Sequence, residues 1–163
     1  MTDPRIGAAL PSVIAQLPDG TGVIVRHDEA PRTERAAIAE LCRVRGIVFG
    51  VAGDVALARD CGASLVHRPH SDSGGLPLSL PVHDEREAGD AARRGAALAF
   101  VSPIFATRSH EGVAGIGLER AVKLAKRSAT LAIALGGMDR DRFAELDGDV
   151  FYGWAGIDAW LRT

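Results

Sequence analysis

The chain has 163 residues, and its 19 Lys and Arg side chains nearly balance its 21 Asp and Glu side chains. The basic residues are scattered and form no stripe with interleaved aromatic residues, which argues against a nucleic-acid partner. No apolar run is long enough to cross a bilayer, and the first residues do not read as a targeting signal, so we expect no membrane partner.

The length favours a single domain over residues 1–163, large enough to bury a substantial core. Cys42 and Cys61 fall in helical segments, and their spacing is typical of neither a metal site nor a disulfide framework. Buried, reduced thiols are the simpler interpretation, and they predict a cytoplasmic protein.

Apolar runs of strand type alternate with segments of helical periodicity along the chain. The predicted strands are residues 23–25, 47–51, 64–67, 78–82, 97–101, 129–135 and 150–155. The predicted helices are residues 33–43, 54–61 and 118–126, with two more that start near Asp84 and Asp139. Asp84 and Glu87 have the spacing of a capping box, in which two carboxylates satisfy free amides at a helix start.

Near-continuous apolar strands separated by helices indicate a parallel sheet covered by helices. The regular repetition favours a closed barrel over an open sheet, which would show a G-x-G-x-x-G loop after its first strand. The predicted fold class is therefore α/β, a small (β/α)8-type TIM barrel. Because such barrels typically need about 200 residues or more, we expect short helices and one incomplete unit.

Small and hydroxylated residues follow two of the predicted strands. Thr107 and Ser109 come after one strand, and Gly136-Gly137 comes after the next. Strand ends of this composition in a parallel α/β protein predict an anion site above the sheet. A tight turn that needs positive φ is the alternative interpretation of the two glycines.

Six segments occur in an order and spacing typical of one known family. They are Val23-Ile-Val-Arg26, Ala52-Gly-Asp-Val-Ala-Leu-Ala58, Gly62-Ala-Ser-Leu-Val-His67, Pro81-Val-His-Asp-Glu-Arg-Glu-Ala88, Ser102-Pro-Ile-Phe-Ala-Thr-Arg-Ser-His110 and Leu135-Gly-Gly-Met138. Together they resemble the thiamine phosphate synthase-like superfamily of small β/α barrels, which includes the synthase and a thiazole tautomerase. The resemblance covers nearly the whole chain, with a reduced helix after the family's fourth strand.

The resemblance implies a thiamin biosynthesis protein that joins hydroxymethylpyrimidine diphosphate to thiazole phosphate and releases diphosphate. The residues matched to the diphosphate site are Arg26, Thr107, Ser109 and His110, the last in place of the family's Lys. Those matched to the thiazole phosphate site are Gly136, Gly137, Ala155 and Gly156. The implied partners are small phosphorylated thiazole and pyrimidine ligands.

Magnesium is the cofactor that the resemblance implies, because the synthase holds Mg²⁺ with an Asn-Asp pair and a further Asp. Here Ala52 and Gly53 replace the pair, and neither side chain can ligate a hard cation. Asp72 matches the further acid, and Asp54 follows the pair by one position, which makes these two the candidate ligands. The tautomerase's His is replaced by Pro103, which cannot transfer protons.

Two side chains have alternative interpretations. Arg26 ends a buried strand, so it either contacts an anionic ligand or forms an ion pair with Asp3, Asp28 or Asp54. His83 closes another strand and is either an acid/base group or a structural histidine.

The family opens with a complete first strand, of which only residues 1–3 match here. A missing strand exposes strand edges, which proteins normally cover. We therefore expect a homo-oligomer or a docked terminal segment at this edge. Two functions without catalysis stay open: a sensor that binds thiazole phosphate or thiamine phosphate without turnover, and an interaction protein that uses the open edge.

Overall fold

The computed structural model describes residues 1–106, 114–146 and 148–160 of the chain. The chain divides into two compact units, residues 1–78 and the residues from 79 onward. Each unit alternates strands with helices, and the strands within each unit are parallel. The prediction of a single domain over residues 1–163 stays a prediction.

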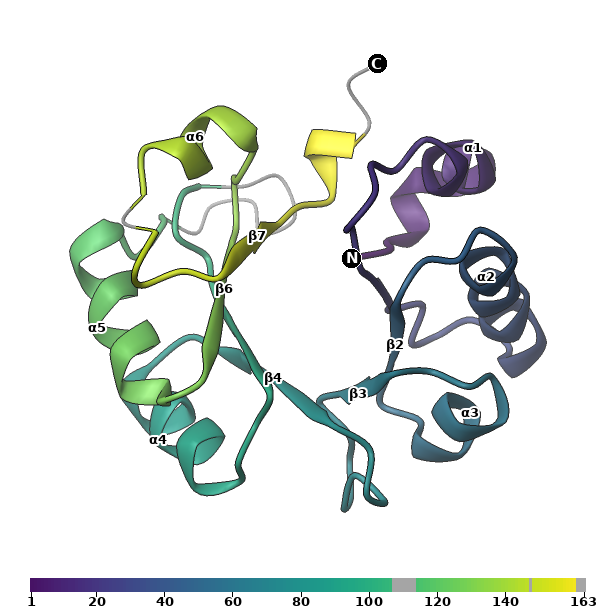
Figure 1. The fold of residues 1–163 in the computed structure, drawn as a ribbon, viewed down its shortest axis with the longest axis horizontal. Helices are drawn as coiled ribbons and strands as arrows, with labels where there is room; N and C mark the ends of the chain where they lie inside the picture. Colours follow the sequence, from purple (N-terminus) through teal and green to yellow (C-terminus); the bar gives the residue numbers. More distant parts are fainter. Residues whose placement is uncertain (107–113, 147, 161–163) are drawn as a thin grey trace. The chain divides into compact units, whose positions relative to one another are not determined.

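The first unit consists of short elements. They are η1 (Pro4–Ala9), α1 (Leu10–Ala15), β1 (Val23–Val25), α2 (Arg32–Val44), β2 (Phe49–Ala52), α3 (Val55–Asp60) and β3 (Leu65–His67). Figure 1 shows α2 and α3 on the same side of β2 and β3. The predicted strands and helices of this unit are all present, most of them shortened by one or two residues.

The core of the first unit is built from one row of β-branched side chains. Val25 lies opposite Val51, which in turn lies opposite Val66, and all three are fully buried. The buried face of α2 contributes Ile38 and Cys42. Because parallel strands are covered by helices, strands that are apolar throughout are the expected pattern.

The second unit follows the same plan. Its elements are β4 (Leu78–Val82), α4 (Glu85–Arg93), β5 (Leu98–Val101), α5 (Leu118–Ser128), β6 (Leu131–Leu135), α6 (Arg140–Ala144), β7 (Gly153–Ala155) and η3 (Asp158–Trp160). The register places Val82, Val101 and Ala134 in one buried row. Alanines in the buried faces of α4 and α5 have small side chains that permit close packing.

Several predicted strands begin later than expected, the last two among them. β6 begins at Leu131 because Ala129 ends α5 with a left-handed φ of 50°, which is incompatible with a strand. The last strand, expected from residue 150, begins only at Gly153. An apolar run thus marks where a strand lies, whereas the cap of the preceding helix decides where it starts.

The capping prediction at Asp84 is correct for one of its two bonds. The carboxylate of Asp84 accepts a hydrogen bond from the Glu87 amide at 2.8 Å. The Glu87 carboxylate, however, accepts from the amide of His83, one residue before the cap, at 2.8 Å. The start of α4 therefore has both of its side-chain caps, with the second displaced by one residue.

Two features of the first unit match the expected departures from a complete barrel. Residues 68–77, between β3 and β4, contain no helix, as expected for a reduced connection. The amide of Thr2 donates to the carbonyl of Ile24 in β1 at 2.9 Å. The first residues thus dock on the edge of β1. A docked terminal segment was one of the two ways in which this edge was expected to be covered, the other being a homo-oligomer.

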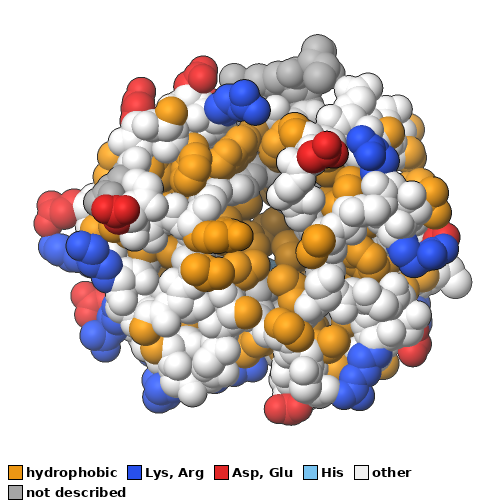
Figure 2. All heavy atoms as spheres, viewed as in Figure 1, with side chains coloured by type: hydrophobic (Ala, Val, Ile, Leu, Met, Phe, Trp, Pro, Cys, Tyr) orange, Lys and Arg blue, Asp and Glu red, His pale blue; other side chains and the backbone are white. Residues whose placement is uncertain are grey.

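The described surface agrees with the composition. On the face drawn in Figure 2, basic and acidic side chains are interspersed, with no continuous basic stripe. Among the described residues, no helix combines the length and apolar character needed to span a bilayer.

Candidate functional site

The segments after β5 and β6 contact each other closely in the second unit. The amide of Ile104 donates to the Leu135 carbonyl at 2.9 Å, and the amide of Phe105 donates to the Gly136 carbonyl at 3.1 Å. Gly136 and Gly137 have φ values of 95° and 62°, a region that favours glycine. These bonds hold the two strand ends as one rigid corner.

Glycine is required at this corner for packing as well as for φ. A Cβ atom on Gly136 would lie 2.6 Å from the Pro103 Cα, and one on Gly137 would lie 2.7 Å from the Ala106 carbonyl oxygen. The structure therefore supports the tight-turn interpretation of Gly136-Gly137. That interpretation is compatible with phosphate binding, because successive amides in such a turn point to one side.

The amides of Gly137 and Met138 are available for a ligand within the described part of the chain. Neither donates to an acceptor among those residues. Gly156, which follows β7, lies beside them, since a Cβ atom there would be 3.3 Å from the Met138 carbonyl oxygen. Ala155 is the last residue of β7 and pairs with Leu135. The four residues matched to the thiazole phosphate site thus come from two neighbouring strand ends.

Arg142 is a cation at this corner that the sequence did not single out. Its guanidinium donates to the Gly137 carbonyl and lies over the Phe105 ring, with Cζ 5.0 Å from the ring centroid. Asp139 caps α6 by accepting from the Arg142 amide at 3.0 Å. The Asp139 cap was the available signal, because it predicts that Arg142 lies in the first turn of the helix.

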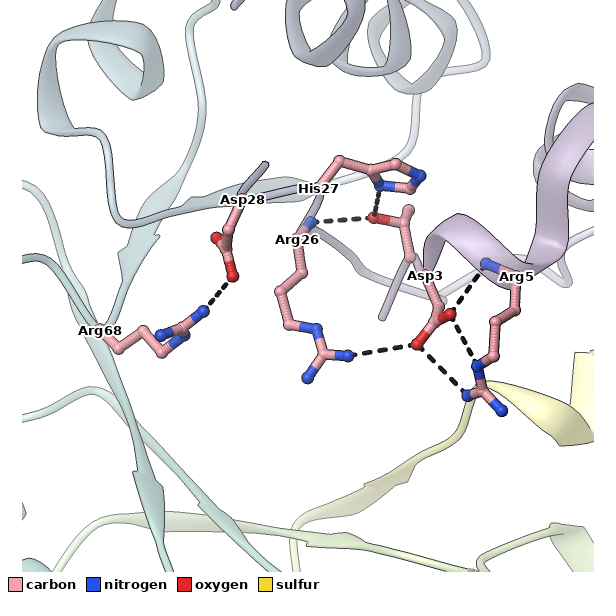
Figure 3. A network of polar contacts seen from close by, with 7 residues as sticks. Asp3, Arg5, Arg26, His27, Asp28 and Arg68 are labelled. Carbon is pink, nitrogen blue, oxygen red and sulfur yellow. Dashed lines mark hydrogen bonds and ion pairs between the residues drawn. The ribbon is translucent and has the colours of Figure 1, made fainter. Parts of the chain in front are cut away.

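Three of the residues matched to the diphosphate site, Thr107, Ser109 and His110, lie outside the described residues. The fourth, Arg26, belongs to the first unit and is drawn in Figure 3. Its Nη2 donates to the Asp3 carboxylate at 3.2 Å, and Arg5 Nε donates to the same carboxylate at 2.9 Å. Of the partners considered for Arg26, the structure selects Asp3.

The start of the chain holds the end of β1 through side-chain contacts as well. Thr2 Oγ1 accepts from the Arg26 amide at 2.9 Å and lies 3.0 Å from His27 Nδ1. Burial lowers the pKa of His27, although the Glu34 and Asp3 carboxylates act in the opposite direction. His27 is therefore a structural group that fixes the backbone at Arg26.

His67, the last residue of β3, is neutral at ordinary pH. Burial lowers the pKa of His67 to about 3, with further lowering by the positive charges of Arg68 and Arg26. A group with such a pKa cannot donate a proton near neutrality. His83, by contrast, is exposed, and its Nδ1 lies 2.8 Å from the Glu87 carboxylate. His83 stays a prediction as an acid/base group.

Neither cysteine has the character of a nucleophile. Cys42 is buried, which raises the pKa of its thiol to about 11. Cys61 is partly exposed, and burial is the main cause that raises its pKa as well. Both are free thiols.

The two tryptophans contact each other in the second unit. Trp154 of β7 and Trp160 of η3 stack with ring centroids 5.3 Å apart and an interplanar angle of 6°. Tyr152, which alternates with Trp154, is 70% exposed. The stacked pair ties η3 to the end of β7, next to Gly156.

The chain matches the family model described as "Thiamine monophosphate synthase" over residues 6–159. The chain belongs to the thiamine monophosphate synthase family. No curated protein matches it in a search of such proteins. The family assignment made from the six sequence segments is thereby confirmed.

Solved structures support the same fold. A thiamine phosphate pyrophosphorylase from Pyrococcus furiosus is 25% identical, with a TM-score of 0.78 over 96% of this chain and 83% of that chain. One from Bacteroides thetaiotaomicron is 17% identical, with a TM-score of 0.62 over 99% and 79%. A citrate synthase is 12% identical, with a TM-score of 0.63 over 96% and 82%. The predicted α/β fold of the TIM-barrel type is confirmed, and the fold alone serves several chemistries.

Both candidate magnesium ligands make hydrogen bonds to other groups, and magnesium stays a prediction. Asp54 caps α3 by accepting from the Leu57 amide at 2.8 Å, and its other oxygen accepts from Arg32 at 2.8 Å. Asp72 accepts from the Gly74 amide at 2.7 Å. The described residues contain no group of three or more His, Cys, Asp or Glu side chains that could hold a metal ion.

Two other side chains lie near the backbone at the positions of the family's missing acid pair. A Cβ atom on Gly53 would lie 3.4 Å from His70 Nε2. The guanidinium of Arg35 donates to the Ala52 carbonyl. Ala52 and Gly53 themselves offer no side-chain oxygen to a metal, and Arg35 occupies the Ala52 carbonyl.

Proposed function

We propose that this protein is a transferase of the thiamine phosphate synthase type. It joins hydroxymethylpyrimidine diphosphate and thiazole phosphate to form thiamine phosphate, and it acts in the cytoplasm. Membership of the family supports this reaction class, and the two free thiols are compatible with the reducing compartment.

The observation that carries the proposal is the corner formed by the segments after β5, β6 and β7. It offers the amides of Gly137 and Met138, and Arg142 adds a positive charge beside them. Amides and a guanidinium are the donors that bind a phosphate monoester. We assign the thiazole phosphate to this corner, with Gly136, Ala155 and Gly156 shaping the backbone around it.

The reaction depends on electrostatic stabilisation of the leaving group more than on covalent catalysis. The bond between the pyrimidine methylene carbon and the diphosphate oxygen breaks, and that oxygen keeps the electron pair. The thiazole nitrogen then forms the new bond to the methylene cation. Positive groups that hold the leaving diphosphate lower this barrier, and positioning the two halves supplies the rest. Arg26 of the first unit is assigned to the diphosphate. Thr107, Ser109 and His110 lie outside the described residues and stay predicted diphosphate ligands on the family resemblance alone.

A second candidate function is favoured by the replacement of the family's Asn-Asp pair by Ala52 and Gly53. A protein that binds thiazole phosphate or thiamine phosphate as a sensor needs the glycine corner and no metal. Such a protein would bind these ligands without turnover. A thiazole tautomerase is not favoured, because Pro103 stands where that enzyme has its His.

The test is a direct assay for thiamine phosphate with both half-molecules, followed by kinetics of two variants. We expect product from the unmodified protein. We expect Arg142→Gln to raise KM for thiazole phosphate about tenfold, the typical effect of one lost charge-assisted bond. Arg140→Gln, in the same helix, is the matched control and should leave KM unchanged.

Two outcomes would reject the synthase proposal. Absence of product, together with a rise in thermal stability on adding thiazole phosphate, would select the sensor. Absence of both would reject the phosphate corner itself. Equal KM values for the two variants would remove Arg142 from the site.

A further inference from the structure

Phe105 and Arg142 form a contact between the segments that follow β5 and β6. The Cζ atom of Arg142 lies 5.0 Å from the centroid of the Phe105 ring, and Nη1 of the same guanidinium donates to the Gly137 carbonyl. A cation within about 6 Å of a ring centroid is attracted by the negative face of the ring. The ring and the carbonyl thus hold one guanidinium together.

The charge of Arg142 has no counter-ion within the described residues. Asp141 and Glu145 are acidic neighbours in and just after α6, yet neither forms an ion pair with Arg142. The Nε and Nη2 groups of Arg142 also donate to no acceptor in this part of the chain. A neutral carbonyl and an aromatic ring therefore hold the guanidinium, and its positive charge and two of its donor groups are left for a ligand.

The Phe105 ring projects from a backbone that is fixed by several contacts. The amide of Phe105 donates to the Gly136 carbonyl at 3.1 Å, and the Gly117 amide donates to the carbonyl of the preceding residue, Ile104, at 3.1 Å. A Cβ atom on Gly115 would lie 2.6 Å from the Phe105 Cα, so the backbones are closely packed here. The ring is consequently a restricted surface for the guanidinium.

Arg142, by contrast, lies in an element that does little to fix its side chain. Helix α6 has five residues and buries none of them. The Asp139 cap accepts from the Arg142 amide at 3.0 Å, which fixes the backbone and leaves the side chain free to rotate. A long exposed side chain loses rotamer freedom when it binds a ligand, and this loss weakens binding. Contact with the Phe105 ring restricts the side chain before the ligand arrives.

We propose that Phe105 is a positioning residue whose ring holds the Arg142 guanidinium in place for the thiazole phosphate. The inference rests on the proposed function, in which Arg142 binds that phosphate. It adds that full phosphate affinity requires an aromatic side chain at position 105. Phe105 acts through Arg142 and needs no contact of its own with the ligand.

The test begins with calorimetric titration of thiazole phosphate into three variants. Phe105→Leu keeps an apolar side chain and removes the ring, so we expect affinity to fall about threefold, the typical effect of an exposed cation–π contact. Phe105→Tyr keeps the ring and should retain the affinity of the unmodified protein. Phe143→Leu is the matched control, since it removes an aromatic ring from α6 itself. Equal affinities of Phe105→Leu and Phe105→Tyr would overturn the proposal.

A double-mutant cycle separates positioning from a general effect on the fold. In an Arg142→Gln background, Phe105→Leu should have no further effect on affinity, because no guanidinium is left to position. In steady-state assays Phe105→Leu should raise KM for thiazole phosphate about threefold and leave kcat unchanged. An equal loss of affinity in both backgrounds would show that Phe105 does not act through Arg142.

Proton NMR of the free protein tests the contact without any ligand. The ring current of Phe105 should shift side-chain signals of Arg142 upfield, and Arg142→Gln assigns those signals by removing them. The shift should be lost in Phe105→Leu and retained in Phe105→Tyr. Unshifted signals in the unmodified protein would contradict the contact, and this measurement decides even where Phe105→Leu does not fold.

The outcomes separate this inference from the proposed function. An intact double-mutant cycle without thiamine phosphate formation would uphold the role of Phe105 and select the sensor over the synthase. Thiamine phosphate formation with no difference between Phe105→Leu and Phe105→Tyr would keep the synthase and reject the positioning role. No binding of thiazole phosphate by the unmodified protein would reject both.

Discussion

A position in this protein can require glycine for two separate reasons: a left-handed φ, or a lack of space for a Cβ atom. Gly137 and Gly95 have nearly the same φ, 62° and 61°. A Cβ atom on Gly137 would meet Ala106, whereas one on Gly95 would have nothing within 4 Å. The two positions therefore allow the requirements to be measured separately.

We predict that Gly137→Ala lowers the free energy of unfolding by about 2–4 kcal/mol, the sum of left-handed strain and overpacking. Gly95→Ala should lower it by about 1 kcal/mol, from strain alone. Urea denaturation of both variants gives the comparison. Equal losses of unfolding free energy in the two variants would show that the segment after β6 accommodates a methyl group without overpacking.

Buried neutral histidine makes stability depend on pH. The pKa of His67 is about 3 in the folded protein, below the ordinary value of 6.5, so the unfolded chain binds a proton that the folded chain does not. The contribution of His67 to stability is therefore complete above about pH 6.5 and is lost as pH falls towards 3. The pKa of His27 is also lowered, which acts with the same sign.

We predict that the free energy of unfolding falls by about 1 kcal/mol or more per pH unit between about pH 6 and 5, where carboxylates hardly titrate. His67→Gln should reduce this slope by about 1 kcal/mol per pH unit and leave the part due to His27. Denaturant titrations at several pH values measure the slope. An unchanged slope in the variant would contradict a neutral, buried His67.

Motif residues were predictable one by one, but their contacts were not. The Gly-Gly pair after β6 and Arg26 after β1 were found from strand-end position and the family resemblance. Arg35 and Arg142 were missed, because each lies in a helix and reaches a strand end only through a long side chain. Helical periodicity predicts which face such a residue occupies, and nothing in it predicts where the guanidinium ends.

At the scale of elements, Asp54 illustrates how a candidate ligand can be a structural group. Its carboxylate caps α3 through the Leu57 amide and pairs with Arg32. Burial alone would raise the pKa of Asp54, but the Leu57 amide and the Arg32 charge more than offset that effect and lower it. The side chain stabilises a six-residue helix that buries Leu57 and Ala58.

We predict that Asp54→Ala lowers the free energy of unfolding by about 1 kcal/mol, the usual loss for a missing N-cap. Asp54→Asn should lose much less, because asparagine also caps helices well. Thermal or urea unfolding measures both. Equal losses in the two variants would contradict the capping role of Asp54.

Elements were the most predictable level of the structure. Every predicted strand and helix is present among the described residues, because long apolar runs and amphipathic periodicity are local signals. Their ends were less predictable. The late start of β6 depends on the left-handed cap at Ala129, and the second bond of the α4 cap moved to His83.

At the scale of the whole molecule, the open question is what covers the exposed edge of β1. The first residues dock on β1 through the Thr2 amide. So short a segment covers little of an edge strand, which is why we still expect a homo-oligomer. Light scattering during size-exclusion chromatography should give the mass of at least a dimer.

A monomeric mass at all accessible concentrations would reject the oligomer. The docked terminal segment would then be the only expected covering left for the edge of β1. The sensor and synthase functions are both compatible with either result, whereas an interaction protein would need its free edge in the monomer.

The sequence alone determined the fold class, the order of the elements and the family, because these depend on periodicity and on motifs that are contiguous in the chain. It also determined that the family's acid pair is absent at Ala52 and Gly53. Only the tertiary structure decided what surrounds those positions. Arg26 and Arg68 follow two different parallel strands and lie at one edge of the sheet, and Arg35 reaches the Ala52 carbonyl there from α2. Charge pairing depends on such through-space neighbours, so the choice of Asp3 as the partner of Arg26 required the folded structure.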